Sequence, residues 1–267
     1  MFGKKKLERM PTQKTWDYAI DMKEGFMPRK GKVYREERKE VQEFIQKQLR
    51  KGYIRLLKLP QTAPVFFVGK KDGKKRMVQD YLYLNEWTVK NNYPLSIISD
   101  IIKNMGTKRV FTKIDLRWGY NNIRIKEGDE WKVVFTTPER LFEPMVMFFG
   151  LTNSLVTFQV MMNELLRDLI NTGKVAAFID DVIVGTESEE GYDELVEKVI
   201  KRLEENNLYM KLEKCKWKVR KVGILGVVIE PEEIKMEEEK VKGVLEWLTP
   251  TCVKNIQKFL GLANYYC

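Results

Sequence analysis

The chain has 267 residues, 43% hydrophobic and 32% charged, which indicates a globular protein and excludes a disordered one. Lysine and arginine exceed aspartate and glutamate by 48 − 38 = 10, so the charge favours a polyanionic partner, nucleic acid first. Histidine is absent, which excludes histidine-based catalysis and His-ligated zinc, and no run approaches the roughly 18 apolar residues of a membrane span.

The first part of the chain predicts a leader, a helix and a hairpin. Residues 1–33 contain several prolines and glycines and predict an irregular leader. Apolar side chains recur at helical spacing over 35–51, and Gly52 suits the end of that helix. Two strands, Pro64–Val68 and Arg76–Tyr81, follow on either side of the basic turn KKDGKK.

The middle of the chain predicts a second helix and several strands. Ile97–Met105 is amphipathic and Gly106 ends it, while Val110–Asp115 has the apolar run of a buried strand. Two more strands are expected around Lys132–Thr136 and Phe142–Met147.

The last part predicts mostly helices. The expected elements are a long helix over 154–171, a hairpin, a charged helix over 189–205, a strand at Gly223–Ile229, and helices over 237–248 and 253–265. Helices mixed with local hairpins predict an α+β fold rather than a doubly wound parallel sheet.

The segment KVAAFIDDVIVGT contains the most informative pattern, two apolar runs around adjacent acidic residues. It predicts strand, tight turn and strand. Hairpin turns favour Asn-Gly or Asp-Gly, whereas Asp180 and Asp181 place two like charges side by side. An ordinary solvated turn is one interpretation. Carboxylates that bind cations are the other.

A third carboxylate, Asp115, ends the strand VFTKID. It is a candidate helix N-cap, but the elements between it and Asp180 could also bring all three carboxylates to one edge of a sheet. Oxygen ligands without histidine favour Mg²⁺. Two such ions about 3.5–4 Å apart can activate one oxygen and stabilise the leaving one.

From about Trp16 onward the chain resembles the reverse transcriptase of a Gypsy-type LTR retrotransposon. The matching runs, in family order, are KKDGKKRMVQDY, LNEWTVKNNYPL, FTKIDLRWGYNNI, FFGLTNSLVTFQVMMN, FIDD, LEKCKW, ILGVVI and FLGLANYY. The resemblance implies a right-hand polymerase that adds dNTPs to the 3′-OH of a primer strand, on an RNA or DNA template, with two Mg²⁺ ions or Mn²⁺ in their place. It also implies an intracellular location, in the cytoplasm, a virus-like particle or the nucleus.

The resemblance also divides the chain into subdomains. It implies a leader or linker at 1–33, fingers at 34–92 and 123–153, palm at 93–122 and 154–229, and the start of a truncated thumb at 230–267.

Specific residues acquire expected roles from the same resemblance. Asp115 and Asp180 match the metal ligands and Asp181 a weaker or indirect one, while Lys214 matches a lysine proposed to protonate the leaving pyrophosphate. Tyr120 matches an aromatic gate against the ribose 2′-hydroxyl, with a half-buried core tyrosine as the alternative. The other nucleotide-binding candidates are Lys70, Lys71, Arg76, Leu116, Arg117, Gly150 and Gln159. The primer or template candidates are Phe178, Leu225 and Gly226.

Several positions depart from the family. It usually has Tyr at Phe178, Arg at Leu82, Pro at Leu155 and Ala at Val156. We expect weaker template binding from Leu82 and overpacking from Leu155 and Val156. The alternative to an active polymerase is therefore a catalytically silent relic that only binds nucleic acid, although the three retained aspartates favour activity.

Overall fold

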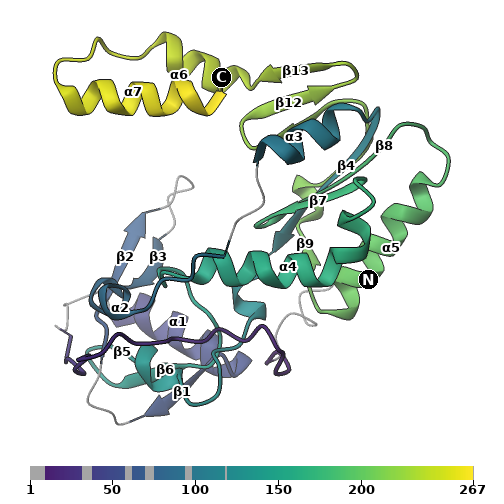
Figure 1. Ribbon diagram of the computed structural model, residues 1–267. Helices are drawn as coiled ribbons and strands as arrows, with labels where there is room; N and C mark the ends of the chain where they lie inside the picture. The colour runs from purple at the N-terminus through teal and green to yellow at the C-terminus, as the bar shows by residue number, and fades with distance from the viewer. Residues whose placement is uncertain are drawn as a thin grey trace.

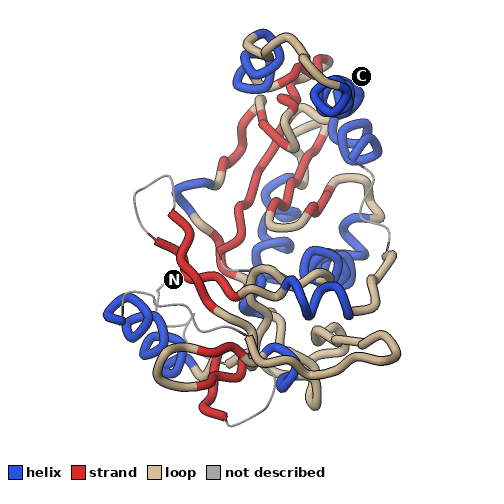
Figure 2. Tube along the Cα trace, turned by 90° about the vertical axis from the view of Figure 1, so that its left-hand side faces the viewer, coloured by secondary structure: helices blue, strands red, loops and turns tan. Residues whose placement is uncertain are grey.

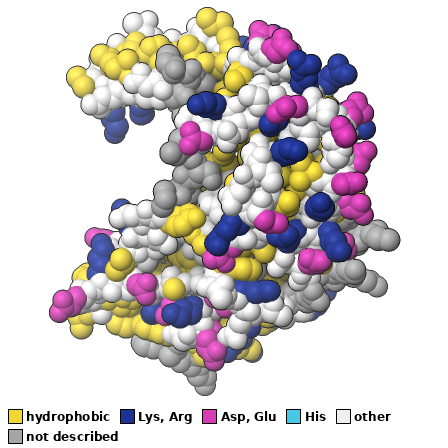
Figure 3. All heavy atoms as spheres, turned by 45° about the vertical axis from the view of Figure 1, so that its right-hand side comes forward, with side chains coloured by type: hydrophobic (Ala, Val, Ile, Leu, Met, Phe, Trp, Pro, Cys, Tyr) yellow, Lys and Arg dark blue, Asp and Glu magenta, His cyan; other side chains and the backbone are white. Residues whose placement is uncertain are grey.

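The computed structural model describes residues 10–31, 38–57, 62–69, 75–93, 98–117 and 119–266. They form an open, C-shaped molecule with a lobe at each end of a central sheet (Figure 1). The space-filling view shows a deep hollow between the two lobes (Figure 3). None of the helices in these ranges is long and apolar enough to cross a membrane.

The first lobe combines short helices with two small antiparallel sheets. Its elements are α1 (Arg38–Lys51), α2 (Leu82–Trp87), the sheet β1–β6–β5 (Ile54–Leu57, Leu141–Pro144, Phe135–Thr136) and the hairpin β2–β3 (Val65–Gly69, Lys75–Gln79). Val41 and Ile45 lie one helical turn apart on α1 and pack into the same core as Phe135 and Phe142. That core is separate from the one beneath the central sheet.

The central sheet has the strand order β10–β4–β8–β7, and β9 pairs with the far end of β4. Its strands are β4 (Val110–Arg117), β7 (Val175–Phe178), β8 (Asp181–Thr186), β9 (Tyr209–Met210) and β10 (Lys216–Val219). In β4, Ile114 and Leu116 are buried in the main core whereas Asp115 and Arg117 are half-buried on the other face. This alternation follows from the two-residue period of a strand.

Two long helices supply much of the main core. They are α4 (Ser154–Ile170) and α5 (Tyr192–Glu205), and buried residues of both, including Phe158 and Val199, belong to one cluster with Ile114 and Leu116. The tube in Figure 2 shows the same arrangement of helices beside the sheet from a second direction.

The second lobe includes a fourth sheet. The elements of this end are α3 (Ile98–Gly106), the sheet β11–β12–β13 (Val222–Ile224, Val227–Glu230, Glu233–Met236), α6 (Glu238–Leu245) and α7 (Val253–Tyr266). Met105 of α3 and Ile229 of β12 are buried in one cluster with Phe111 of β4, which attaches this sheet to the central one.

Most predicted elements are confirmed within a few residues, but two strands are wrong. The strand expected at Lys132–Thr136 is a 3₁₀ turn, Glu130–Val133, followed by the two-residue β5; the Lys132 N–H donates to the Asp129 carbonyl at 3.0 Å, which closes the turn. The strand expected at Gly223–Ile229 is two strands joined by a tight turn at Leu225 and Gly226, both with positive φ.

The described part of the leader, residues 10–31, has little regular structure but is tied to the rest of the protein. Tyr18 and Ile20 are fully buried in the main core. Tyr18 N–H donates to the Arg124 carbonyl at 2.8 Å, and Ile20 N–H donates to Asp129 Oδ2 at 2.7 Å. This segment is therefore part of the folded core structure.

Candidate active site

The three predicted carboxylates lie together at one end of the central sheet. The antiparallel register of β4 and β8 sets Asp115 directly opposite Asp181. The Leu116 N–H donates to the Asp180 carbonyl at 2.9 Å, which extends this pairing into the β7–β8 turn. Residues 65 positions apart in sequence thus become neighbours through strand pairing.

Two lysines form ion pairs with the carboxylates of Asp115 and Asp181. Lys211 Nζ lies 2.5 Å from Asp115 Oδ1, and Lys113 Nζ lies 3.1 Å from Asp181 Oδ2. Charge-assisted contacts of this kind are among the stronger hydrogen bonds in proteins. Lys211 comes directly after β9, and its backbone N–H also donates to the Asp115 carbonyl at 2.8 Å.

Asp180 is less well compensated. Its Oδ1 atom is buried and has no hydrogen-bond partner among the described residues. Desolvation raises the pKa of this carboxyl to about 6; the Lys211 charge opposes the rise, and the Asp115 and Asp181 charges add to it. A buried carboxylate oxygen without a partner is costly and is suited to binding a cation.

The donor set fits a hard divalent cation such as Mg²⁺. Asp180 Oδ1 is the oxygen that has no hydrogen bond and could coordinate the ion. The pairing of β4 with β8 places Asp115 and Asp181 beside it. In the described part of the chain, however, no three acidic, cysteine or histidine side chains already converge as a metal site. Asp115 and Asp181 are turned toward their lysines, so binding would require these side chains to reorient.

The turn that carries Asp180 is strained. Ile179 has φ +52°, a left-handed conformation that a β-branched residue rarely adopts. Its N–H donates to Gln159 Oε1 at 2.8 Å, and Gln159 Nε2 donates to the Ala177 carbonyl at 2.9 Å. Gln159 is fully buried on α4, so it ties the helix to both sides of the turn.

Tyr120 lies beside this turn with firm packing behind its ring. Its ring centroid is 5.0 Å from that of Phe149 and 5.3 Å from that of Phe158. Burial and the nearby Asp180 charge raise the pKa of Tyr120 to about 12. The preceding Gly119 is tightly enclosed, because a Cβ there would stand 2.5 Å from the fully buried Phe158 ring and 3.1 Å from Asp180 Oδ1.

Comparison with known proteins identifies the family. The profile described as "Reverse transcriptase (RNA-dependent DNA polymerase)" matches residues 68–229. The Tf2-3 and Tf2-7 transposon polyproteins of Schizosaccharomyces pombe (strain 972 / ATCC 24843) are 34% and 33% identical over 217 residues, 81% of this chain and 16% of theirs. The chain belongs to the reverse transcriptase family.

Solved structures agree with this assignment at the level of fold. The foamy viral protease–reverse transcriptase in complex with double-stranded DNA superposes with a TM-score of 0.79, at 23% identity, over 93% of this chain and 44% of that one. The same viral enzyme in complex with an RNA/DNA hybrid gives 0.75 at 21% identity, over 96% and 36%. These matches confirm the predicted α+β polymerase fold, and the transposon relatives confirm the Gypsy-type resemblance. The chain spans about a sixth of the length of those relatives, 16%.

Within this reverse transcriptase fold, several residues predicted to contact nucleotide already have partners within the protein. The Leu116 side chain is in the core, and its N–H donates to the Asp180 carbonyl. The Arg117 guanidinium pairs with Glu213 at 3.0 Å. Gln159 is buried and braces the turn, so these contacts support positioning rather than the predicted contact with nucleotide.

The structure places a second lysine beside the predicted one. Lys214 is exposed in the 3₁₀ turn Leu212–Lys214, and the structure gives it no ion pair with any described carboxylate. Lys211, which sequence reasoning missed, is the lysine in contact with Asp115. The only sign of this lysine in the sequence was the pair of basic residues in MKLEK. The pairing of β9 with the end of β4, which brings Lys211 to Asp115, cannot be read from local sequence pattern.

The remaining candidates of the reverse transcriptase site are placed as follows. Lys70 and Lys71 lie outside the described residues, and for Arg76 only the backbone, in β3, is described. Gly150 has φ +99°, so a side chain there would be strained. Phe178 is half-buried at the end of β7, and Leu225 and Gly226 form the β11–β12 turn.

The overpacking expected at the start of α4 is not found at Leu155. Leu155 is 46% exposed, so its larger side chain extends into solvent instead of crowding the core. Val156 is half-buried.

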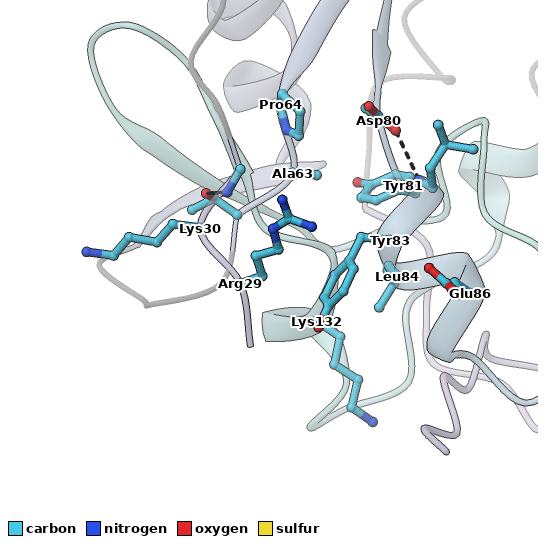
Figure 4. Close-up of a pocket in the computed structure, with 13 residues that line it drawn as sticks. Arg29, Lys30, Ala63, Pro64, Asp80, Tyr81, Tyr83, Leu84, Glu86 and Lys132 are labelled. Atoms are coloured by element: carbon cyan, nitrogen blue, oxygen red, sulfur yellow. Dashed lines mark hydrogen bonds between the residues drawn. The ribbon is translucent and has the colours of Figure 1, made fainter. Parts of the chain in front are cut away.

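A separate cavity of about 520 Å³ lies in the first lobe, between the leader, the start of β2 and α2 (Figure 4). Arg29 points toward Tyr83 there, with its guanidinium carbon 5.4 Å from the ring centroid. Leu82 lines the same cavity and is 76% exposed. The rest of the lining is mixed, with apolar Ala63, Pro64 and Leu84 beside charged Asp80 and Glu86.

Proposed function

We propose that this domain is an RNA-directed DNA polymerase that adds dNTPs to a primer 3′-OH on an RNA or DNA template. The observation that carries the proposal is the geometry of the β4–β8 pair, which sets Asp115 opposite Asp181 beside the unpartnered buried oxygen of Asp180. The foamy viral relatives, whose structures contain double-stranded DNA or an RNA/DNA hybrid, support nucleic acid as the partner. An intracellular location is part of the same proposal.

In this mechanism Asp115 and Asp180 hold the divalent cations, with Asp181 as the weaker or indirect ligand. Bound Mg²⁺, or Mn²⁺ in its place, would activate the primer hydroxyl and stabilise the leaving pyrophosphate. The chain itself supplies position: Gln159 fixes the turn that presents Asp180. The Asp180 carboxyl is mostly ionised at neutral pH because its pKa, about 6, lies below 7.

Tyr120 is the proposed selector of deoxynucleotides. Phe149 and Phe158 hold its ring from two sides, so the ring cannot easily yield to a ribose 2′-hydroxyl. An apolar pocket alone rejects an added hydroxyl only about 10²-fold, which is why stiff packing behind the ring matters.

Fingers, palm and thumb boundaries at 34–92 with 123–153, at 93–122 with 154–229, and at 230–267 belong to this proposal. The separate core of the first lobe and the hollow between the lobes support the division. Lys70, Lys71, Arg76 and Arg117 remain proposed triphosphate contacts, Lys214 the proposed proton donor, and Phe178, Leu225 and Gly226 the proposed primer or template contacts.

Primer extension tests the proposal. Purified chain with an RNA template, a DNA primer, dNTPs and Mg²⁺ should lengthen the primer, and the Asp180→Asn variant should not. Extension no better than the variant's would refute polymerase activity for this chain.

A silent relic that only binds nucleic acid is the second candidate, favoured by the exposed Leu82 where the family usually has arginine. It predicts salt-sensitive binding in the wild type and the Asp180→Asn variant alike, without extension by either.

A further inference from the structure

Lys211 is fixed at the metal site by its backbone as well as by its charge. Its N–H donates to the Asp115 carbonyl at 2.8 Å, and its own carbonyl accepts from Lys214 N–H at 2.8 Å and Cys215 N–H at 3.1 Å. These three backbone hydrogen bonds fix the position of the main chain at Lys211. The Lys211 side chain is 26% exposed, so it is partly enclosed but still reaches solvent.

The Lys211 ammonium pairs with Asp115, the neighbour of Asp180. Nζ is 2.5 Å from Asp115 Oδ1, and the bond from the Leu116 N–H to the Asp180 carbonyl, 2.9 Å, holds Asp180 next to Asp115. Asp181 has its own cation, since Lys113 Nζ is 3.1 Å from Asp181 Oδ2. The charge of Lys211 thus falls where Asp115 and Asp180 would share a metal ion.

We propose that Lys211 is a built-in substitute cation, which occupies the Asp115–Asp180 position when metal is absent and must leave it for a divalent ion to bind. An ammonium and a divalent ion that share one carboxylate repel each other strongly at such short range. Without the ammonium, three neighbouring carboxylates would repel one another in a partly buried site. Lys211 therefore stabilises the metal-free fold and lowers the affinity for metal.

This inference rests on the proposed function, because it needs the aspartates to be metal ligands. It is tested without primer, template or nucleotide. The probe is Mn²⁺ alone, added to chelator-treated protein, with free Mn²⁺ measured by electron paramagnetic resonance. Lys211→Met should bind Mn²⁺ about 10-fold more tightly than wild type, or more.

Lys201→Met is the matched control, because it makes the same change of net charge at an exposed position on α5 that has no proposed part in the site. Its affinity for Mn²⁺ should stay near that of wild type. Asp115→Asn combined with Lys211→Met should abolish the gain. Equal Mn²⁺ affinities for wild type and Lys211→Met would overturn the inference.

A second measurement uses only wild-type protein and so does not depend on the variant folding. Lysines are acetylated briefly with and without Mg²⁺, and each site is quantified by mass spectrometry. Released from Asp115, Lys211 should be labelled more in Mg²⁺, while labelling of Lys201 stays constant. Labelling of Lys211 that is unchanged or reduced by Mg²⁺ contradicts the proposal.

The two proposals fail in different ways. No primer extension, together with tighter Mn²⁺ binding by Lys211→Met, would refute polymerase activity and leave the substitute cation in place. Primer extension by wild type, together with an unchanged Mn²⁺ affinity in Lys211→Met, would support polymerase activity and refute the substitute cation.

Discussion

At the scale of single residues, charge compensation divides the three aspartates. Asp115 and Asp181 each pair with a lysine, whereas Asp180 has a buried oxygen with no hydrogen-bond partner among the described residues. Its pKa, raised from 3.8 to about 6, records this cost. In the metal-free protein, the residue most important for the proposed chemistry is thus one that weakens the fold.

Asp180→Asn should therefore stabilise the metal-free protein at pH 7.5. The pKa of the folded state is the higher one, so protonation of Asp180 favours folding below 3.8, and that advantage is lost as the pH rises through about 6. After allowance for partial exposure, we expect a gain of about 1–2 kcal/mol in the free energy of unfolding. The gain should shrink as the pH falls below 6 and nearly vanish at about pH 4. Urea unfolding in EDTA at several pH values measures it, and a variant less stable than wild type at pH 7.5 would count against the electrostatic argument.

Leu82 is the second residue with a measurable consequence. It is 76% exposed beside the cavity lined by Arg29 and Tyr83, where the family usually has arginine. Leu82→Arg should tighten binding to a primer–template with a single-stranded RNA overhang, and should steepen the salt dependence by about one counterion. Fluorescence anisotropy at several salt concentrations measures both.

Leu56→Arg is the matched control for this change, because Leu56 is also exposed, at 49%, but lies on β1 and does not line the cavity beside Leu82. If both variants tighten binding equally, the effect is one of net charge and the cavity in the first lobe has no special part in it.

At the scale of elements, the β7–β8 hairpin depends on α4 for its shape. Gln159 accepts from Ile179 N–H and donates to the Ala177 carbonyl, so one buried amide holds a strained turn to the helix. The sequence predicted this hairpin and its two strands because apolar runs flank FIDD. It did not predict the brace, because an amide on a helix gives no local sign of which turn it will contact.

Gln159→Leu tests the brace. It leaves the Ile179 N–H without its partner in the interior, which typically costs about 1–3 kcal/mol of stability. A positioning role predicts a large fall in kcat for primer extension with little change in KM for dNTP, whereas direct nucleotide contact predicts a rise in KM. Asn163→Ala is the control, since it removes the bond from Gln159 Nε2 to Asn163 Oδ1 and the bond from Asn163 Nδ2 to Tyr93 Oη but spares the Ile179 N–H.

Other elements show the same limit of sequence reasoning. Asp115 could be joined to the hairpin because it ends a clear buried strand, and the β4–β8 register then fixed its position. Lys211 could not be assigned to the same site from the sequence, because β9 has only two residues, Tyr209–Met210, and its pairing with the end of β4 is set by tertiary packing. Likewise, the Gly223–Ile229 run gave no sign that Leu225 would adopt φ +53° and split it into two strands.

At the scale of the whole molecule, the aspartates belong to a sheet that joins two lobes around an open hollow (Figure 3). The fold class followed from the mixture of helices and hairpins, and the family from the ordered motifs. The buried leader did not follow, since Tyr18 and Ile20 lie in a segment without helical or strand periodicity. The net charge of +10 suits a polyanionic duplex, so binding should weaken steeply with salt.

The most direct test of the polymerase is extension of a DNA primer on an RNA template in Mg²⁺, by wild type and Asp180→Asn side by side. Both proteins should bind the primer–template with similar affinity, which excludes a folding defect as the cause of any difference. The account predicts extension by wild type alone. Equal extension by both proteins, or none by a wild type that binds normally, would contradict it.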